Sequence, residues 1–339
     1  MNRKTFKTYL ITGATGLVGS HLAEFLVRNG QKVRCFVRPN SDISFLNTLQ
    51  VEIIQGDLTK AVSLDRAVSG VDVVFHCAAM VSDWADRDTM VRVNVGGTRN
   101  IVDACLKHKV QRFVMVSSLA VLGMDKQINA NETAPYVYTG DNYNYTKIES
   151  EKLVMQMHRE QNLPAVIVRP PYIYGPRDRQ LLPRVVSFLK DGKFVFIGAG
   201  ENPISLVYVK NLVYALCLAS ERDKAVGQIY HITDGQDISR REFIGTLAKK
   251  LGYAEPSKSV PVALAKIMCP VLEGINKLTR SKTPPLLNKF RMKFLDTYLT
   301  FDISKARNEL GYKSEYSFDS ALDETVAWFR NEEFVSAGV

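Results

Sequence analysis

A glycine-rich turn near the N-terminus constrains the fold of this chain most strongly. The apolar run 9–12 leads directly into Gly13, Gly16 and Gly19, and apolar residues then recur at helical spacing up to Leu26. Glycines at this spacing permit a tight turn, let the backbone approach a pyrophosphate and bring helix and strand close together. A turn that merely needs glycines would look similar, but the strand before it and the helix after it favour a phosphate-binding loop.

A second motif contains the residues for proton transfer. Tyr143 and Lys147 are four positions apart and would share one face of a helix. A phenol has a pKa near ~10, and a neighbouring ammonium is expected to lower that pKa and make Tyr143 a usable acid or base. Ser117 and Ser118 follow the apolar strand 112–116, and a serine hydroxyl at this place can hydrogen-bond a substrate oxygen. Alone, a Tyr–Lys pair is more often a surface pair; with the glycine turn and these serines it predicts a catalytic site.

Together these motifs resemble the extended short-chain dehydrogenase/reductase family, along nearly the whole chain. The family pattern TGxxGxxG, a strand-end Ser or Thr and YxxxK is reproduced, and further landmarks stand at 56–58, 76–79, 94 and 169–176. The resemblance implies an NAD(P)-dependent oxidoreductase with Ser118, Tyr143 and Lys147 as its catalytic residues. The resemblance and the glycine turn together indicate that the cofactor is held by Gly13, Thr15, Gly16, Leu17, Val18, Gly19, Asp57, Leu58, Ala78, Ala79, Asn94, Ser117, Tyr143, Lys147, Pro170 and Tyr172.

The order of apolar runs predicts an α/β fold of the Rossmann type, with a doubly wound parallel sheet. Runs near 8–12, 33–37, 51–54, 72–77, 112–116 and 165–168 alternate with helical patterns. Residues 1–175 are expected to form the nucleotide-binding domain and 176–335 mainly a smaller substrate-binding lobe. The short strands 194–197 and 229–232 are expected in the smaller lobe, whereas the strand and helix at 206–219 are expected to return to the large sheet.

The end of the second strand bears on the choice of dinucleotide. Val37 takes the position where NAD-preferring enzymes place a carboxylate, and Arg38 follows it with Arg34 nearby. An arginine at this place suits the 2′-phosphate of NADP. NADP is therefore favoured over NAD, although both arginines could instead be solvated charges at the strand end.

Two departures from the sugar-nucleotide branch of the family bear on the substrate. Tyr172 replaces an Asn of that branch, and the apolar segment 204–206 replaces an Arg that precedes an Asp-Phe pair. Both lost groups would bind a nucleotide diphosphate. The candidate pocket side chains at strand ends are instead apolar or aromatic: Met80, Trp84, Leu122, Tyr136, Tyr138, Tyr172 and Tyr174. We expect a lipophilic alcohol or ketone, contacted by Met80, Trp84, Tyr136, Tyr172 and Arg177.

The C-terminal region is similar to one branch of the family. The segments 283–286 and 300–306 resemble 3β-hydroxysteroid dehydrogenases and 3-oxo-acid reductases. Two alternatives stay open at this point: a nucleotide-sugar epimerase or dehydratase, which would keep its cofactor bound through the cycle, and a dinucleotide-binding sensor or scaffold without catalysis.

Most of the excess positive charge lies in one stretch. The net charge is +9, and residues 258–293 contain eight Lys or Arg and a single acid, Glu273. A basic, amphipathic insertion at 258–295 predicts either peripheral contact with an anionic membrane or a solvated lid over the site. Nucleic acid is not an expected partner, because the stretch lacks interleaved aromatic residues and a recognised binding motif.

Cysteine spacing and terminal signals bear on location and assembly. The five cysteines stand singly, so we expect no metal site and a reducing compartment. Both expectations agree with a cytoplasmic protein. If the basic stretch binds a membrane, the protein would be peripheral there. The basic N-terminus leads into a predicted strand, so we do not expect it to be a signal peptide, and we expect the apolar run 260–272 to be too short to span a bilayer. Resemblance to the family also suggests a homodimer through helices near 88–108 and 143–160.

Overall fold

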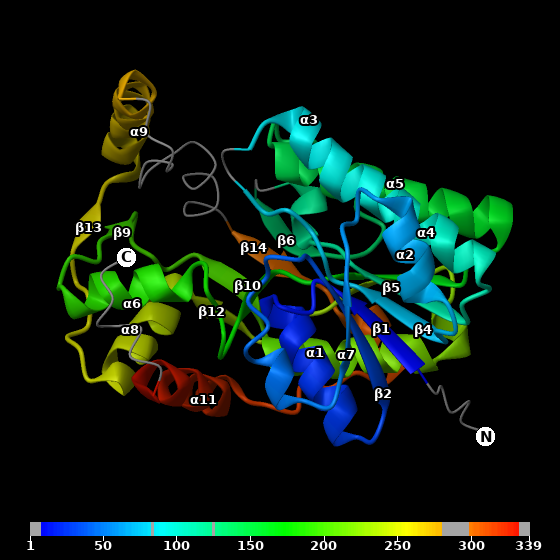
Figure 1. The fold of residues 1–339 in the computed structure, drawn as a ribbon. Helices are drawn as coiled ribbons and strands as arrows, with labels where there is room; N and C mark the ends of the chain where they lie inside the picture. The colour runs from blue at the N-terminus through cyan, green and yellow to red at the C-terminus, as the bar shows by residue number, and fades with distance from the viewer. Residues whose placement is uncertain (1–7, 83–84, 124–125, 280–297, 332–339) are drawn as a thin grey trace.

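The computed structural model describes residues 8–82, 85–123, 126–279 and 298–331. Its larger domain is built on a seven-stranded parallel sheet with the strand order β11-β7-β5-β4-β1-β2-β3 (Figure 1). The strands are β1 Thr8–Thr12, β2 Lys32–Val37, β3 Glu52–Gln55, β4 Val73–His76, β5 Arg112–Val116, β7 Ala165–Arg169 and β11 Ile229–His231. The strand order reverses between β1 and β4, and a ligand crevice lies at such a switch point in folds of this kind. The predicted doubly wound sheet is confirmed.

Helices cover both faces of this sheet because successive strand residues point to opposite sides. Ile11 of β1 packs in a core with the helices α1 Leu17–Arg28 and α7 Val209–Glu221. Its neighbour Leu10 packs in a second core with α4 Gly97–Lys107, α5 Asn142–Gln161 and α2 Ala61–Val68. These strands are therefore buried on both faces, which explains their almost continuous apolar sequence.

The smaller lobe has its own sheet and core. Its strands are β6 Gln127–Ala130, β8 Tyr172–Tyr174, β10 Pro203–Tyr208, β12 Asp237–Ser239 and β14 Leu299–Phe301, with β9 Phe196–Ile197 and β13 Ser259–Val260 forming a separate pair. Its helices are α6 Leu182–Lys190, α8 Arg240–Leu251, α9 Val262–Leu278 and α11 Phe318–Asn331. Short helical segments connect the elements at η1 Leu46–Thr48, α3 Arg87–Met90, η2 Val91–Gly96, η3 Leu119–Leu122, η4 Asp223–Ala225 and η5 Ala306–Leu310.

One prediction about the exchange between the lobes was wrong, and a second was correct for a helix but wrong for the strand before it. The strand at 229–232 does not belong to the smaller lobe, because β11 pairs in parallel with β7, with Ile229 opposite Ile167. The unit at 206–219 is divided. Its strand β10 pairs with β8, β12 and β14 of the smaller sheet, whereas its helix α7 packs against α1 on the large sheet.

Two further expectations concern thiols and membrane spans. All five cysteines are free, and four of them are buried. Within the described ranges, no helix combines the length and apolar character needed to cross a membrane.

Candidate active site

The glycine turn forms a close-packed backbone cradle between β1 and α1. Gly13 has φ +69°, and a Cβ on it would lie 2.8 Å from the backbone N and Cα of Ala78, at the end of β4. A Cβ on Gly19 would collide with the carbonyl oxygen of Gly13. Gly16 caps α1 without a side chain, so the first-turn N–H groups of the helix face the cradle. The cradle fits the pyrophosphate of a dinucleotide, because a helix N-terminus offers it backbone N–H groups and a side chain on Gly13 or Gly19 would collide with the backbone around it.

The end of β5 brings two serines beside Tyr143. The Ser118 hydroxyl accepts a hydrogen bond of 3.2 Å from the backbone N–H of Ala120 and is also hydrogen-bonded to the phenol of Tyr143. The Ser117 hydroxyl is buried and has no hydrogen-bond partner among the described residues. An unsatisfied buried hydroxyl is costly, so Ser117 fits a group supplied by a bound cofactor.

Lys147 lies one helical turn beyond Tyr143, as the spacing predicts. It is 5% exposed, and its Nζ donates a 2.9 Å hydrogen bond to the carbonyl of Val116 in β5. The same Nζ is 5.8 Å from the centre of the Tyr143 ring. The structure therefore brings Ser118, Tyr143 and Lys147 together at the end of one central strand.

Burial determines the acidity of these groups in the ligand-free chain. It lowers the pKa of Lys147 to about 8, with the charge of Glu151 acting in the opposite direction. It also raises the pKa of Tyr143 to about 12, although the hydrogen bond from Ser118 lowers it. The expectation that Lys147 would depress the pKa of Tyr143 needs correction here, because loss of hydration outweighs every other influence on the phenol.

The start of α5 is held by local hydrogen bonds. The carboxylate of Asp141 caps the helix by accepting from the N–H of Asn144. Asn144 is fully buried, and its Nδ2 donates to the carbonyls of Ala120 at 2.6 Å and Val137 at 3.1 Å. These contacts fix α5 against the segment after β5, which is why Tyr143 meets Ser118.

Sequence reasoning missed a buried network of an ion pair and a hydrogen bond at Glu151, one helical turn after Lys147. Glu151 and Arg169 are 0% and 2% exposed and form an ion pair with an Nη2–Oε2 distance of 2.6 Å. The hydroxyl of Tyr136 donates to the same carboxylate at 2.9 Å. The sequence contained one signal: Glu151 is four residues after Lys147 and so lies on the helix face that carries the site.

Asn94 holds the segment after β4. Its Oδ1 accepts from the N–H of Met80 at 2.7 Å, and its Nδ2 donates to the Met80 carbonyl and to Thr146. Both polar atoms of the Asn94 amide are engaged within the protein, and its predicted cofactor contact stays a prediction. Asn94 positions Met80, a predicted substrate contact, over the end of β4.

Two predicted ligand contacts need correction. The guanidinium of Arg34 pairs with Glu52 at 2.8 Å and donates to two carbonyls near α2, because its place in β2 directs it toward β3. The guanidinium of Arg177 contacts α1 instead of a substrate pocket: it pairs with Glu24 at 2.7 Å and lies over the ring of Phe45. Trp84 lies outside the described residues.

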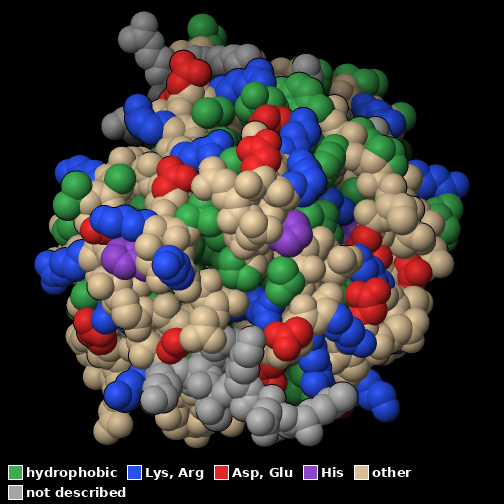
Figure 2. All heavy atoms as spheres, turned by 90° about the vertical axis from the view of Figure 1, so that its right-hand side faces the viewer, with side chains coloured by type: hydrophobic (Ala, Val, Ile, Leu, Met, Phe, Trp, Pro, Cys, Tyr) green, Lys and Arg blue, Asp and Glu red, His purple; other side chains and the backbone are tan. Residues whose placement is uncertain are grey.

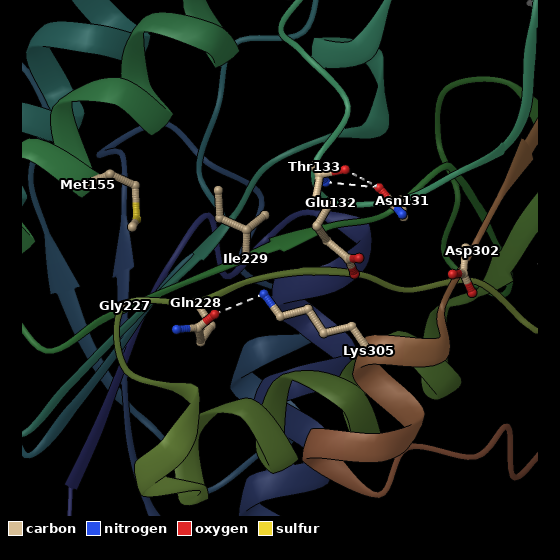
Figure 3. Close-up of a pocket in the computed structure, with 9 residues that line it drawn as sticks. All are labelled: Asn131, Glu132, Thr133, Met155, Gly227, Gln228, Ile229, Asp302 and Lys305. Atoms are coloured by element: carbon tan, nitrogen blue, oxygen red, sulfur yellow. Dashed lines mark hydrogen bonds between the residues drawn. The ribbon is translucent and has the colours of Figure 1, made fainter.

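The remaining predicted positions keep their assignments as predictions. Asp57 accepts hydrogen bonds from the backbone and hydroxyl of Thr59, which lower its pKa. The Tyr172 hydroxyl donates to Asp178 at 3.1 Å. An open pocket lies at the edge strand β11, where Lys305 donates to Gln228, and the predicted catalytic residues do not line it (Figure 3).

With this geometry established, comparison with known proteins is informative. Residues 10–262 match the sequence profile of the 3-beta hydroxysteroid dehydrogenase/isomerase family. The chain belongs to this family. This 3-beta hydroxysteroid dehydrogenase/isomerase family member is an NAD(P)-dependent oxidoreductase of the extended short-chain dehydrogenase/reductase type.

Individual relatives of this family member cover most of its length. A human protein, "sterol-4-alpha-carboxylate 3-dehydrogenase, decarboxylating", is 30% identical over 98% of the chain and 90% of its own length. The "2-alkyl-3-oxoalkanoate reductase" of Shewanella oneidensis is 29% identical over 92% and 84%, respectively. A solved dTDP-glucose 4,6-dehydratase of Streptomyces venezuelae with NAD bound has a TM-score of 0.79 at 25% identity, over 96% of this chain and 98% of its own.

Proposed function

We propose that this enzyme interconverts lipophilic 3-oxo acids and the corresponding 3-hydroxy acids. The observation that carries the proposal is the meeting of Ser118, Tyr143 and Lys147 beside the glycine cradle. The substrate class is supported by two relatives. In the names of both, the reacting carbon stands next to the carbon that carries the carboxyl group, as carbons 3 and 4 of a sterol 4-carboxylate and carbons 3 and 2 of an oxoalkanoate.

The geometry assigns a role to each catalytic side chain. When bound, the nicotinamide dinucleotide supplies or accepts a hydride. Since the pKa of Tyr143 is about 12, its phenol is protonated at neutral pH and can donate that proton to the carbonyl oxygen as negative charge develops there. Ser118 donates a second hydrogen bond to the same oxygen, and the Lys147 ammonium stabilises the phenolate that Tyr143 leaves behind.

The decisive test replaces Tyr143 by Phe. We expect Tyr143→Phe to reduce turnover of a long-chain 3-oxo acid by about 10²–10⁴-fold, because the proton donor is lost. Dinucleotide binding, followed by fluorescence, should stay within about twofold, since the cradle is untouched. Tyr145→Phe on the same helix is the matched control and should retain activity. Full reductase activity in Tyr143→Phe would refute the proposed mechanism, and a protein that binds the cofactor but reduces no ketone would support a sensor.

A preference for NADP is a further part of this proposal. Arg38 is exposed at the end of β2, and its charge acts on Asp57. Arg38→Ala should lower kcat/KM for NADPH by about one to two orders of magnitude and leave that for NADH nearly unchanged, because an arginine suits the 2′-phosphate. Arg34→Ala is the control, since Arg34 is engaged with Glu52. An unchanged NADPH to NADH ratio in Arg38→Ala would contradict this preference.

The solved dehydratase favours one other candidate, a nucleotide-sugar epimerase or dehydratase. The segment that would carry a diphosphate-binding arginine is here Ile204 and Leu206, which are 7% and 3% exposed in the core of the smaller lobe. We therefore rank this candidate second. Conversion of a dTDP-hexose without net NADPH consumption would support it, whereas NADPH oxidation with a 3-oxo acid or a 3-ketosteroid supports the reductase.

The remaining assignments concern assembly and location. We propose a homodimer through α4 and α5, which pack side by side on one face of the large sheet. Sedimentation analysis tests it, and a monomer at every concentration would exclude it. The five free thiols favour a cytoplasmic location.

A further inference from the structure

Helix α9 displays an unusual row of exposed apolar side chains. Spaced three or four residues apart, these side chains share one face of the helix. They are Leu264 (47% exposed), Ile267 (66%), Met268 (41%), Val271 (57%), Ile275 (53%) and Leu278 (86%). We call this set the α9 stripe. Figure 1 shows α9 standing apart from the body of the molecule, beyond β13.

A different side of α9 attaches the helix to the protein. Ala265 and Cys269 are buried and pack with Ile197 and Val260 of the small β9–β13 pair. The α9 stripe is therefore not needed to hold the helix in place. Exposed apolar groups arranged in one row, rather than scattered singly, mark an interaction surface. By contrast, the face in Figure 2 mixes small apolar areas with interspersed basic and acidic side chains.

Charge identifies the kind of partner. The stretch that contains α9, residues 258–293, has eight basic residues and one acid, and so contributes +7 of the net charge of +9. Lys258 and Lys266 are exposed. An apolar helical face in a stretch of chain with a strong excess of basic residues attracts a surface that is both apolar and negatively charged, which is the property of an anionic lipid bilayer.

The length of α9 indicates contact with the bilayer surface and not a crossing. Its 17 residues span about 26 Å at ~1.5 Å per residue, which is shorter than the ~30 Å hydrocarbon core.

We propose that the α9 stripe inserts into the surface of an anionic lipid bilayer and holds this enzyme at the membrane. The inference goes beyond the proposed reaction and does not depend on it, because exposure and charge alone carry it. If the proposed function also holds, the enzyme meets a lipophilic substrate where that substrate dissolves.

Vesicle cosedimentation of the full chain tests the proposal. The vesicles are either phosphatidylcholine alone or an equal mixture of phosphatidylcholine and phosphatidylglycerol. We expect the wild type to bind the anionic vesicles and to bind the neutral ones clearly more weakly. The variant Ile267→Ser/Ile275→Ser should weaken binding to anionic vesicles by at least about tenfold, because it removes two apolar side chains from the contact. The matched control Val62→Ser/Ile128→Ser removes two exposed apolar side chains elsewhere and should bind like the wild type.

Several outcomes would overturn the proposal. The proposal is wrong if the wild type does not bind anionic vesicles, or if the Ile267→Ser/Ile275→Ser variant binds them as well as the wild type does. Self-association of the wild type that the variant loses, without vesicle binding, would assign the α9 stripe to a second copy of the chain. Circular dichroism checks that both double variants are folded. None of these experiments measures turnover. A negative vesicle result would therefore not contradict the proposed reductase activity, and absence of reductase activity would not contradict membrane binding.

Discussion

At the scale of single residues, burial controls the chemistry of the candidate site. Lys147 is almost fully enclosed, and its pKa falls to about 8 because the ammonium loses hydration. As pH rises through that value, Lys147 loses the charge that would stabilise the Tyr143 phenolate. Ketone reduction should therefore decline above pH 8, and kcat/KM measured against pH checks this. The surface variant Lys152→Met should keep the profile, whereas a flat profile up to pH 10 would contradict the assigned role.

A second prediction at this scale concerns the buried pair behind Lys147. Glu151→Gln leaves the Arg169 guanidinium buried without its carboxylate, and an unpaired buried charge costs about 3–5 kcal/mol. Urea unfolding should show a loss of that size. Tyr136→Phe, which removes one hydrogen bond from the same carboxylate, should cost only about 1 kcal/mol. Equal losses in the two variants would show that the ion pair is not the critical contact.

At the scale of elements, the junction of β1 and α1 depends on the absence of side chains. Gly19→Ala would bring a methyl group against the backbone of Gly13 and Ala14 within the cradle. We expect dinucleotide affinity to fall by at least about tenfold, since the cradle must open to relieve the collision. Gly274→Ala in α9 is the control. A Cβ there meets no atom within 4 Å, so affinity should not change and α9 should gain helix propensity. Tight dinucleotide binding by Gly19→Ala would exclude the cradle as the site.

At the scale of the whole molecule, buried histidines link stability to pH. Burial lowers the pKa of His21, His76 and His231 to about 3 in each case. The unfolded chain binds protons at these histidines near pH ~6.5, so their contribution to stability is complete above that pH and is lost as pH falls below it. Below that pH, each histidine lowers the free energy of unfolding by up to about 1.4 kcal/mol per pH unit. Asp234, whose pKa rises to about 6, binds a proton more readily in the folded chain and partly offsets this loss.

Urea unfolding at pH 7.5 and pH 5.5 measures this dependence. The midpoint should fall clearly at the lower pH. His76→Gln removes one of the three histidines and should make the fall less steep, although it also breaks the contacts with Thr12 and Thr98. Equal stability at the two pH values would show that these histidines titrate normally in the folded chain.

Local patterns in the sequence determined the Rossmann-type sheet, the glycine cradle and the grouping of Ser118, Tyr143 and Lys147. A strand, a turn and a helix follow from neighbouring residues, and the carboxyl ends of parallel strands meet at one edge, which brings Ser118 toward Tyr143. Only the tertiary structure decided the place of β11 and the division of 206–219, because strand pairing depends on which sheet edge is free. It also decided that Arg34 turns to Glu52, that burial rather than Lys147 governs the pKa of Tyr143, and that Glu151 meets Arg169. Each of these findings depends on contacts between groups from separate elements and on the exclusion of water by packing. Spacing along the chain shows neither the contacts nor the loss of water.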